Sequence, residues 1–331
     1  MATLTSNNLT MAELAKRFDP DGKVAPIVEL LSQSNPIVDH AIAIQGNLPT
    51  GHRFVQRVAL PTVGLRALNE GVQQSKSKTA QIDEAVALVQ AYSDIDVDLA
   101  ELNGNINQTR YTEDKAFVEA MNQKFVELLF YGDPANDPKE FRGLATRYNS
   151  TSAPGYGDNI VVDPNASGSN CMSLFFVTWD ENATFLITPK GSAAGLQQND
   201  KGEVPVEDSS GGIYYVYRTE FKWKFGLGVK DWRQNARIQV DRDAMFGTTS
   251  PNEVFDLIAE GFSKIHNRNM GRLYAYCSRE FYLWLWKAAM RLTSNSTLAR
   301  VDVENGRPLL RVFGVPVFEM DGVAATETVI S

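Results

Sequence analysis

Residues 52–101, HRFVQRVALPTVGLRALNEGVQQSKSKTAQIDEAVALVQAYSDIDVDLAE, form a stretch whose charge changes sign halfway. Between residues 52 and 80 a single acidic side chain, Glu70, faces a basic set made up of Arg53, Arg57, Arg66, Lys76 and Lys78. Between residues 81 and 101 every charged side chain is acidic: Asp83, Glu84, Asp94, Asp96, Asp98 and Glu101. The pattern favours extended structure with a polar middle, so we expect a long ribbon with a positive and a negative part.

This ribbon is longer than one compact domain needs internally. At about 3.3 Å per residue, two strands of about twenty residues reach roughly 60 Å. An isolated hairpin is at best marginally stable in water, and this one carries apolar side chains that need a surface: Phe54, Val55, Val58, Leu60, Val63 and Leu65. We therefore expect it to lie on a neighbouring copy of the chain, where opposite charges pair and set the register. An arm and its landing site are different patches, which favours cyclic, head-to-tail assembly.

Composition excludes several classes of protein. The chain has 331 residues, of which 43% are apolar, enough for a large folded core. It has neither a run of eighteen apolar residues nor the basic start and apolar stretch of a secretory signal, so we expect a soluble protein with no membrane partner. The net charge of −8 argues against a protein that binds nucleic acid by neutralising phosphates. Cys171 and Cys277 each lie beside apolar residues, which is typical of buried free thiols.

Periodic segments predict a mixed α and β protein. Apolar spacings of three and four predict a helix over 113–130, capped by Thr112 and stopped by Gly132. A period of two over 213–229 predicts one long strand, or two that meet at a glycine bend, with a buried aromatic face and a wet charged face. Because the rings and the charges alternate, we interpret this stretch as core and not as a nucleic-acid platform.

Further helices and a broken strand follow towards the C-terminus. A capping box at Ser250–Glu253 predicts a helix through 265, and an apolar segment over 278–292 predicts a helix covered on most sides. The last strand, within RPLLRVFGVPVFEMDG at 307–322, is interrupted by Gly314 and Pro316. Proline cannot donate to a ladder, so we expect this strand at an edge or a bend.

No catalytic motif is found in the sequence. Phosphate-binding loops, dinucleotide fingerprints, zinc-protease motifs and nucleophile elbows are all missing from it, and its three histidines are widely spaced. The remaining candidate is the series Asp94, Asp96 and Asp98, which on a strand would point three carboxylates to one face and could bind Mg²⁺ for hydrolysis. We prefer the interpretation of a half-buried strand with an acidic wet side. The sequence therefore predicts no catalytic residue, no cofactor and no metal.

The order of segments resembles a known family of structural proteins. An N-terminal arm, the extended stretch 46–103, the helix TEDKAFVEAMNQKFVELLFYGD, the motif GLATRYNS, the aromatic YCSREFYLWLWKAAM and the terminal FGVPVFEMDG are similar to the major capsid proteins of short-tailed double-stranded DNA bacteriophages. The group that is typified by the Bordetella phage coat protein is the most similar. The resemblance covers essentially the whole chain, and its most specific parts are residues 46–103 and GLATRYNS.

This resemblance implies an α+β fold of the Hong Kong-97-like type, with the topology permuted in some members of the group. The implied domains are an N-terminal arm over 1–50, an extended loop over 51–103, a peripheral domain with the spine helix over 104–139, a mainly axial domain over 140–245, and the remaining helices and C-terminal strand over 246–331. The extended loop would lie over the adjacent subunit. Its contacts are expected to involve Arg53, Arg57, Arg66, Lys76, Lys78, Asp94, Asp96 and Asp98.

The implied function is structural. Copies of the chain would form the hexamers and pentamers of an icosahedral head that encloses double-stranded DNA without binding it specifically. Further partners would be a cement or decoration protein, a portal and a scaffolding protein, with assembly in the host bacterial cytoplasm and the virion capsid as destination. Two alternatives stay open at this point: the shell protein of a bacterial nanocompartment, and a Mg²⁺-dependent hydrolase that uses Asp94, Asp96 and Asp98.

Overall fold

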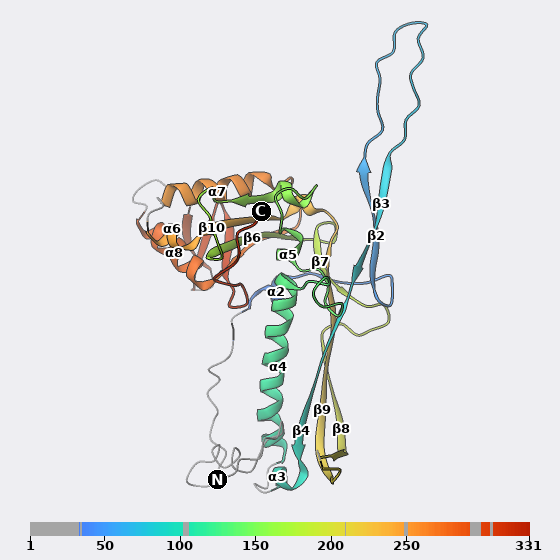
Figure 1. The fold of residues 1–331 in the computed structure, drawn as a ribbon, viewed down its shortest axis with the longest axis vertical. Coiled ribbons are helices and arrows are strands. Elements are labelled where there is room, and N and C mark those ends of the chain that lie inside the picture. Colours follow the sequence, from blue (N-terminus) through green and yellow to red (C-terminus); the bar gives the residue numbers. More distant parts are fainter. Residues whose placement is uncertain are drawn as a thin grey trace. The chain divides into compact units, whose positions relative to one another are not determined.

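The computed structural model describes residues 33, 35–101, 106–208, 210–247, 251–291, 299–304 and 307–331 (Figure 1). The first 32 residues of the expected N-terminal arm, and Ser250 of the expected capping box, lie outside the described residues. The described chain forms two compact units: residues 88–127 with 195–224, and residues 35–87 with 128–194 and 225–331. No helix in the described ranges is both long and apolar enough to cross a membrane.

The smaller unit consists of one long helix against a sheet. Its elements, some of which continue into the larger unit, are β4 (Ala87–Asp96), α3 (Val97–Glu101), α4 (Ile106–Tyr131), β8 (Leu196–Glu207) and β9 (Ile213–Val229). The strands lie in the order β8, β9, β4. Phe117 of α4 stacks on Phe221, and Phe125 stacks on Trp223 with ring centroids 4.5 Å apart. Each stacked pair contributes about 1 kcal/mol of stabilising free energy beyond that of burying its rings. The helix is thus held on β9 by aromatic contacts.

The long helix and the long strand were both predicted, with errors at their ends. Gly132 ends α4 as expected, and its N–H donates to the Leu128 carbonyl. The prediction that Thr112 caps the helix is wrong, because α4 already includes Ile106 and the Thr112 hydroxyl donates backwards to the Gln108 carbonyl at 2.8 Å. Strand β9 is one continuous strand, the first of the two predicted alternatives, but Tyr215 on its expected buried aromatic face is 57% exposed.

The larger unit holds the main hydrophobic core. Its elements are α2 (Ile37–His40), β1 (Ala43–Gln45), β2 (Gly51–Ala59), β3 (Lys78–Ala85), α5 (Leu144–Arg147), η1 (Tyr156–Asn159), β5 (Ile160–Val162), β6 (Cys171–Trp179), β7 (Thr184–Thr188), η2 (Trp232–Gln234), β10 (Ala236–Asp241), α6 (Arg242–Gly247), α7 (Pro251–Lys264), β11 (Arg272–Cys277), α8 (Arg279–Arg291), β12 (Ala299–Glu304), β13 (Arg307–Val312) and β14 (Val315–Glu319). Strand β6 pairs with β10 on one side and β11 on the other. It is buried along its whole length, including its two polar residues, Ser173 and Thr178.

Helices α7 and α8 cover one face of these strands (Figure 1). Phe255 and Ile258 of α7 and Phe281 and Leu285 of α8 pack there in one apolar cluster. The prediction that α8 is covered on most sides is wrong in part, since its outer face leaves Met290 72% exposed. The two cysteines are free and buried, as expected.

The broken C-terminal strand is a hairpin. Phe313 and Gly314 both have positive φ, 51° and 81°, and join β13 to β14 in a tight turn of the kind that fits the twist of a hairpin. The expected bend is therefore present, but the expected edge position is wrong: β14 lies between β13 and β11, and β12 lies at the edge. Pro316 is tolerated because β11 pairs only with the three residues that follow it, Val317 to Glu319.

Candidate assembly surface

Only the first part of the ribbon predicted over 52–101 is present, as the hairpin of β2 and β3 together with the loop 60–77 (Figure 1). The rest of the prediction is wrong, because residues 87–96 form β4, which pairs with β9, and residues 97–101 form α3. The strands of the hairpin pair antiparallel from Gly51 opposite Ala85 to Ala59 opposite Lys78. Arg53 and Asp83 face each other on neighbouring strands and form a two-pronged ion pair, with both N···O distances 2.6 Å. These hydrogen bonds raise the pKa of Arg53 and lower the pKa of Asp83. Part of the predicted pairing between the positive and the negative half thus occurs within one chain.

The loop at the end of the hairpin is apolar and open to solvent. The Ser75 hydroxyl donates to the Thr62 carbonyl at 2.6 Å and ties the two limbs together. A turn at the tip has Asn69 in the left-handed region, with φ 68°. Before this turn four leucine and valine side chains are mostly or fully exposed, namely Leu60 at 78%, Val63 at 89%, Leu65 at 104% and Leu68 at 95%, and Val72 after it is 48% exposed. Contiguous exposed apolar side chains mark an interaction surface, and we call residues 60–72 the apolar tip.

The predicted basic contact residues all lie on this hairpin and its loop. Arg57 is exposed on β2, and Lys78 is exposed at the start of β3. Arg66 and Lys76 are exposed in the loop, where the Arg66 Nε–H donates to the Glu70 carbonyl at 2.7 Å. Arg66 and Lys76 thus place positive charge in the loop that carries the apolar tip, while Arg57, Lys78 and Arg53 lie on the strands of the hairpin. The hairpin is therefore complementary to a partner surface that is acidic and partly apolar.

The three aspartates do not form the row that the sequence predicts. Strand β4 ends at Asp96, so Asp98 lies on helix α3 and not on a strand. Asp94 forms a two-pronged ion pair with Arg218 of β9, at 2.6 and 2.7 Å. Asp96 instead caps α3, because its Oδ1 accepts the Asp98 backbone N–H at 2.9 Å. Among the residues that the structure describes, no three histidine, cysteine or carboxylate side chains are placed to hold a metal ion.

At the root of the hairpin the structure has a buried ion pair that sequence reasoning missed. Arg147 of α5 donates from both terminal nitrogens to the two carboxylate oxygens of Glu84, at 2.7 and 2.6 Å. The side chains are only 4% and 8% exposed. Arg147 also donates to the carbonyls of Leu227 and Arg142, each at 3.1 Å. Burial alone would lower the pKa of Arg147, but the adjacent Glu84 carboxylate outweighs it and the pKa is raised. A signal for this site was present, since Arg147 lies within the motif GLATRYNS.

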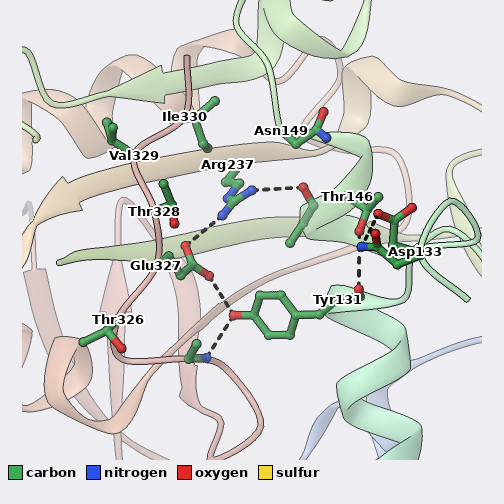
Figure 2. Close-up of a pocket in the computed structure, with 13 residues that line it drawn as sticks. Tyr131, Asp133, Thr146, Asn149, Arg237, Thr326, Glu327, Thr328, Val329 and Ile330 are labelled. Carbon is green, nitrogen blue, oxygen red and sulfur yellow. Dashed lines mark hydrogen bonds and ion pairs between the residues drawn. The ribbon is translucent and has the colours of Figure 1, made fainter. Parts of the chain in front are cut away.

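The larger unit also has a polar hollow of about 620 Å³ beside its C-terminal segment (Figure 2). At its centre Glu327 accepts from Arg237 and from the Tyr131 hydroxyl, both at 2.7 Å. Burial and the neighbouring Glu327 charge raise the pKa of Tyr131, so its phenol stays protonated. Arg237 donates further to the carbonyls of Ala145 and Tyr148. These charged groups bind one another, and their arrangement anchors the C-terminal segment in the core without presenting a reactive group.

Comparisons with known proteins agree on one class. The family model described as major capsid protein GP7 matches residues 19–331. A chain from a near-atomic cryo-EM structure of bacteriophage Epsilon15 is 26% identical, with a TM-score of 0.77, covering 100% of this chain and 99% of its own. A chain of the bacteriophage JBD30 capsid is 9% identical with a TM-score of 0.53, covering 89% and 93% respectively, and this supports the fold alone. A search of curated protein sequences gave no significant match.

Proposed function

We propose, from the premise that the chain belongs to the major capsid protein GP7 family, that hairpin β2–β3 joins its copies by lying on the neighbouring subunit of the shell. The chain is a phage capsid protein with the mixed α+β fold of Hong Kong-97-like capsids, as the sequence resemblance implied. Members of this family are structural proteins and not enzymes. The hydrolase alternative has no support, because two of its three aspartates are engaged with other protein groups and the described residues hold no metal cluster.

The observation that carries the proposal is the apolar tip. Leu65 and Leu68 are fully or almost fully exposed, and burying a leucine side chain contributes about 1.5–3 kcal/mol. A neighbouring copy supplies that burial for every subunit of a closed shell. The basic residues along the hairpin and its loop, Arg53, Arg57, Arg66, Lys76 and Lys78, set the register of the contact. Asp94 and Asp96 have partners within their own unit, so we assign the contact chiefly to the basic residues and the tip.

In this proposal the shell is icosahedral and is built from hexamers and pentamers around packaged double-stranded DNA. Helix α4 takes the place of the spine helix, and residues 140–245 supply most of the axial domain. A portal, a scaffolding protein and a cement protein complete the particle, which assembles in the cytoplasm of the bacterial host. The net charge of −8 supports a wall that does not hold the DNA tightly. DNA-filled particles with a portal vertex, seen by electron microscopy, would distinguish this reading from a nanocompartment shell.

The test is assembly of the purified chain. Wild-type protein should sediment as large particles that appear as closed shells in negative stain. The double variant Leu65→Asp with Leu68→Asp should stay small and folded, because charged tips cannot be buried on the neighbour. The matched control is Leu283→Asp, a leucine on α8 that is 49% exposed and lies outside the hairpin, which should still assemble. Wild-type protein that remains monomeric at every concentration, or a tip variant that forms normal shells, would overturn the proposal.

A further inference from the structure

We propose that the buried ion pair between Arg147 and Glu84 is a positioning element, which fixes the direction in which hairpin β2–β3 leaves the larger unit. This inference deepens the proposed function and rests on it, because the direction matters only if the hairpin must land on a neighbour. Nothing about the exposed tip itself sets that direction. It has to be set where the hairpin meets the body.

The geometry at the root is directional. A planar guanidinium that shares two hydrogen bonds with one carboxylate fixes both the distance and the plane of its partner. Here the carboxylate belongs to Glu84, one residue before the end of β3, and the guanidinium belongs to α5 of the body. The additional bond from Arg147 to the Leu227 carbonyl, at 3.1 Å, ties the same guanidinium to β9. One side chain therefore connects the hairpin to two elements of the body.

The backbone at the root leaves little room for movement around this pair. A methyl group at Gly51 would lie 1.9 Å from the Glu84 carbonyl oxygen, and one at Gly226 would lie 2.5 Å from the Ala85 carbonyl oxygen. The strands are thus in van der Waals contact on both sides of Glu84. A second contact, from the Gln56 side-chain amide to the Lys230 carbonyl, lies farther along β2. The ion pair is the charged contact among these, and both of its side chains are buried.

Stability alone does not account for such a pair. A buried ion pair often contributes no more to folding than apolar residues of the same size would, because both charges lose their hydration. A small change in the geometry of the pair, in contrast, becomes a large displacement at the tip, because the hairpin is long. The span from Gly51 to Leu68 is about 17 residues, or about 56 Å when extended, so a tilt of about 10° at the root displaces the tip by about 10 Å. That displacement is larger than a contact between side chains tolerates.

The test measures the direction of the hairpin in the single chain. Spin labels at Gln74→Cys in the loop and Glu181→Cys on the body report one distance by electron double resonance, and the two native cysteines are buried and stay unlabelled. We expect one narrow distance distribution in the unassembled full-length chain. Glu84→Gln and Arg147→Lys each keep the size of the side chain but lose the two-pronged charged pair, and each should broaden the distribution about twofold. Arg147→Lys should broaden it less than Arg147→Met, since it keeps the charge.

The control is Asp83→Asn, which removes the exposed ion pair with Arg53 one position away on the same strand. It should leave the distribution narrow. The double variant Glu84→Met with Arg147→Met should stay folded by circular dichroism and still show the broad distribution. A narrow distribution in folded Glu84→Gln would overturn the inference. Unfolding of every root variant beside a folded Asp83→Asn would also overturn it, because the pair would then serve stability and not direction. Neither result depends on shell formation, so failure here is distinguishable from failure of the proposed assembly.

Discussion

The stability cost of replacing Gly51 is set by one close contact with the backbone of the neighbouring strand. This glycine pairs with Ala85 at the root of the hairpin, where an added Cβ would meet the Glu84 carbonyl oxygen at 1.9 Å. Gly51→Ala must therefore push β2 and β3 apart, which we expect to cost about 1–3 kcal/mol of folding free energy. Urea unfolding of the full chain measures this cost. Gly71→Ala, in the open loop with no atom within 4 Å of its Cβ, is the control and should change stability by less than about 0.5 kcal/mol.

Asp114 of α4 is expected to reduce stability at neutral pH. Burial raises the pKa of its carboxyl above the ordinary value, although the charge of Arg110 opposes the shift. A carboxyl whose pKa is higher in the folded than in the unfolded state loses stability as pH rises between the two values. Asp114→Asn removes that loss and keeps an acceptor for the Gln198 amide. We expect the Tm at pH 7 to rise by about 1–2 °C.

The pH dependence of this effect is its internal control. Below about pH 4 the aspartate is protonated in the unfolded state too, so wild type and Asp114→Asn should then melt together. A calorimetric series from pH 3 to pH 7 shows whether the two curves converge. A constant difference over this range would mean that packing, and not the charge, separates the two proteins.

At the scale of elements, the hairpin contains a histidine close to its root. Burial and the charge of Lys230 lower the pKa of His52, and Glu84, its partner across the strands, partly opposes them. A histidine whose pKa is lowered by folding contributes stability above its unfolded pKa, and this is lost as pH falls from about 6.5 towards the folded value. We expect amide exchange in β2 to become faster at pH 5.5 than at pH 7.5, after correction for intrinsic rates.

His52→Gln should remove most of this pH dependence, because the amide does not titrate. His266→Gln replaces an exposed histidine outside the hairpin and should leave the dependence unchanged. Hydrogen exchange followed by mass spectrometry resolves both effects in peptides from residues 51–59. If the two variants behave alike, protonation of His52 does not loosen the root.

At the scale of the whole molecule, the positive charge of the hairpin is expected to govern assembly. Arg57 is exposed on β2, so Arg57→Glu should leave the fold intact and lower the assembled fraction about tenfold, equivalent to ~1.4 kcal/mol per contact. Analytical sedimentation separates shells from unassembled chains. Lys139→Glu makes the same charge reversal on an exposed lysine outside the hairpin and should assemble normally. Normal shells from both Arg53→Glu and Arg57→Glu would contradict the role of charge complementarity.

The elements that the sequence predicted well are those whose pattern repeats over many residues. Helix α4 and strand β9 were found because periods near 3.6 and 2 persist over several turns or pleats. The errors concern where an element begins or ends and which strands it pairs with. Thr112 has the chemistry of a cap but hydrogen-bonds inside the helix, and Pro316 indicated an edge strand although β11 covers only the part of β14 that follows it. Local sequence cannot specify where a partner strand stops.

The residues of the candidate surface also fall into those that the sequence predicted and those that it did not. The basic residues of the hairpin and the apolar side chains of its loop were found in the sequence, because they are neighbours along the chain. The pair of Glu84 and Arg147 was not found, since its members lie 63 residues apart. Asp94, Asp96 and Asp98 show the reverse error: they are close in sequence, but β4 ends before Asp98, and Asp94 and Asp96 bind different groups.

By itself, then, the sequence determined that this chain has a long basic hairpin, a mixed α and β body and the segment order of a capsid protein. These features depend on local periodicity, local charge and chain order, all of which are written along the polypeptide. Only the tertiary structure decided how the hairpin is held, because the ion pair at its root is formed by side chains that folding brings together from separate elements. Burial of both charges requires that meeting, and no local pattern encodes it.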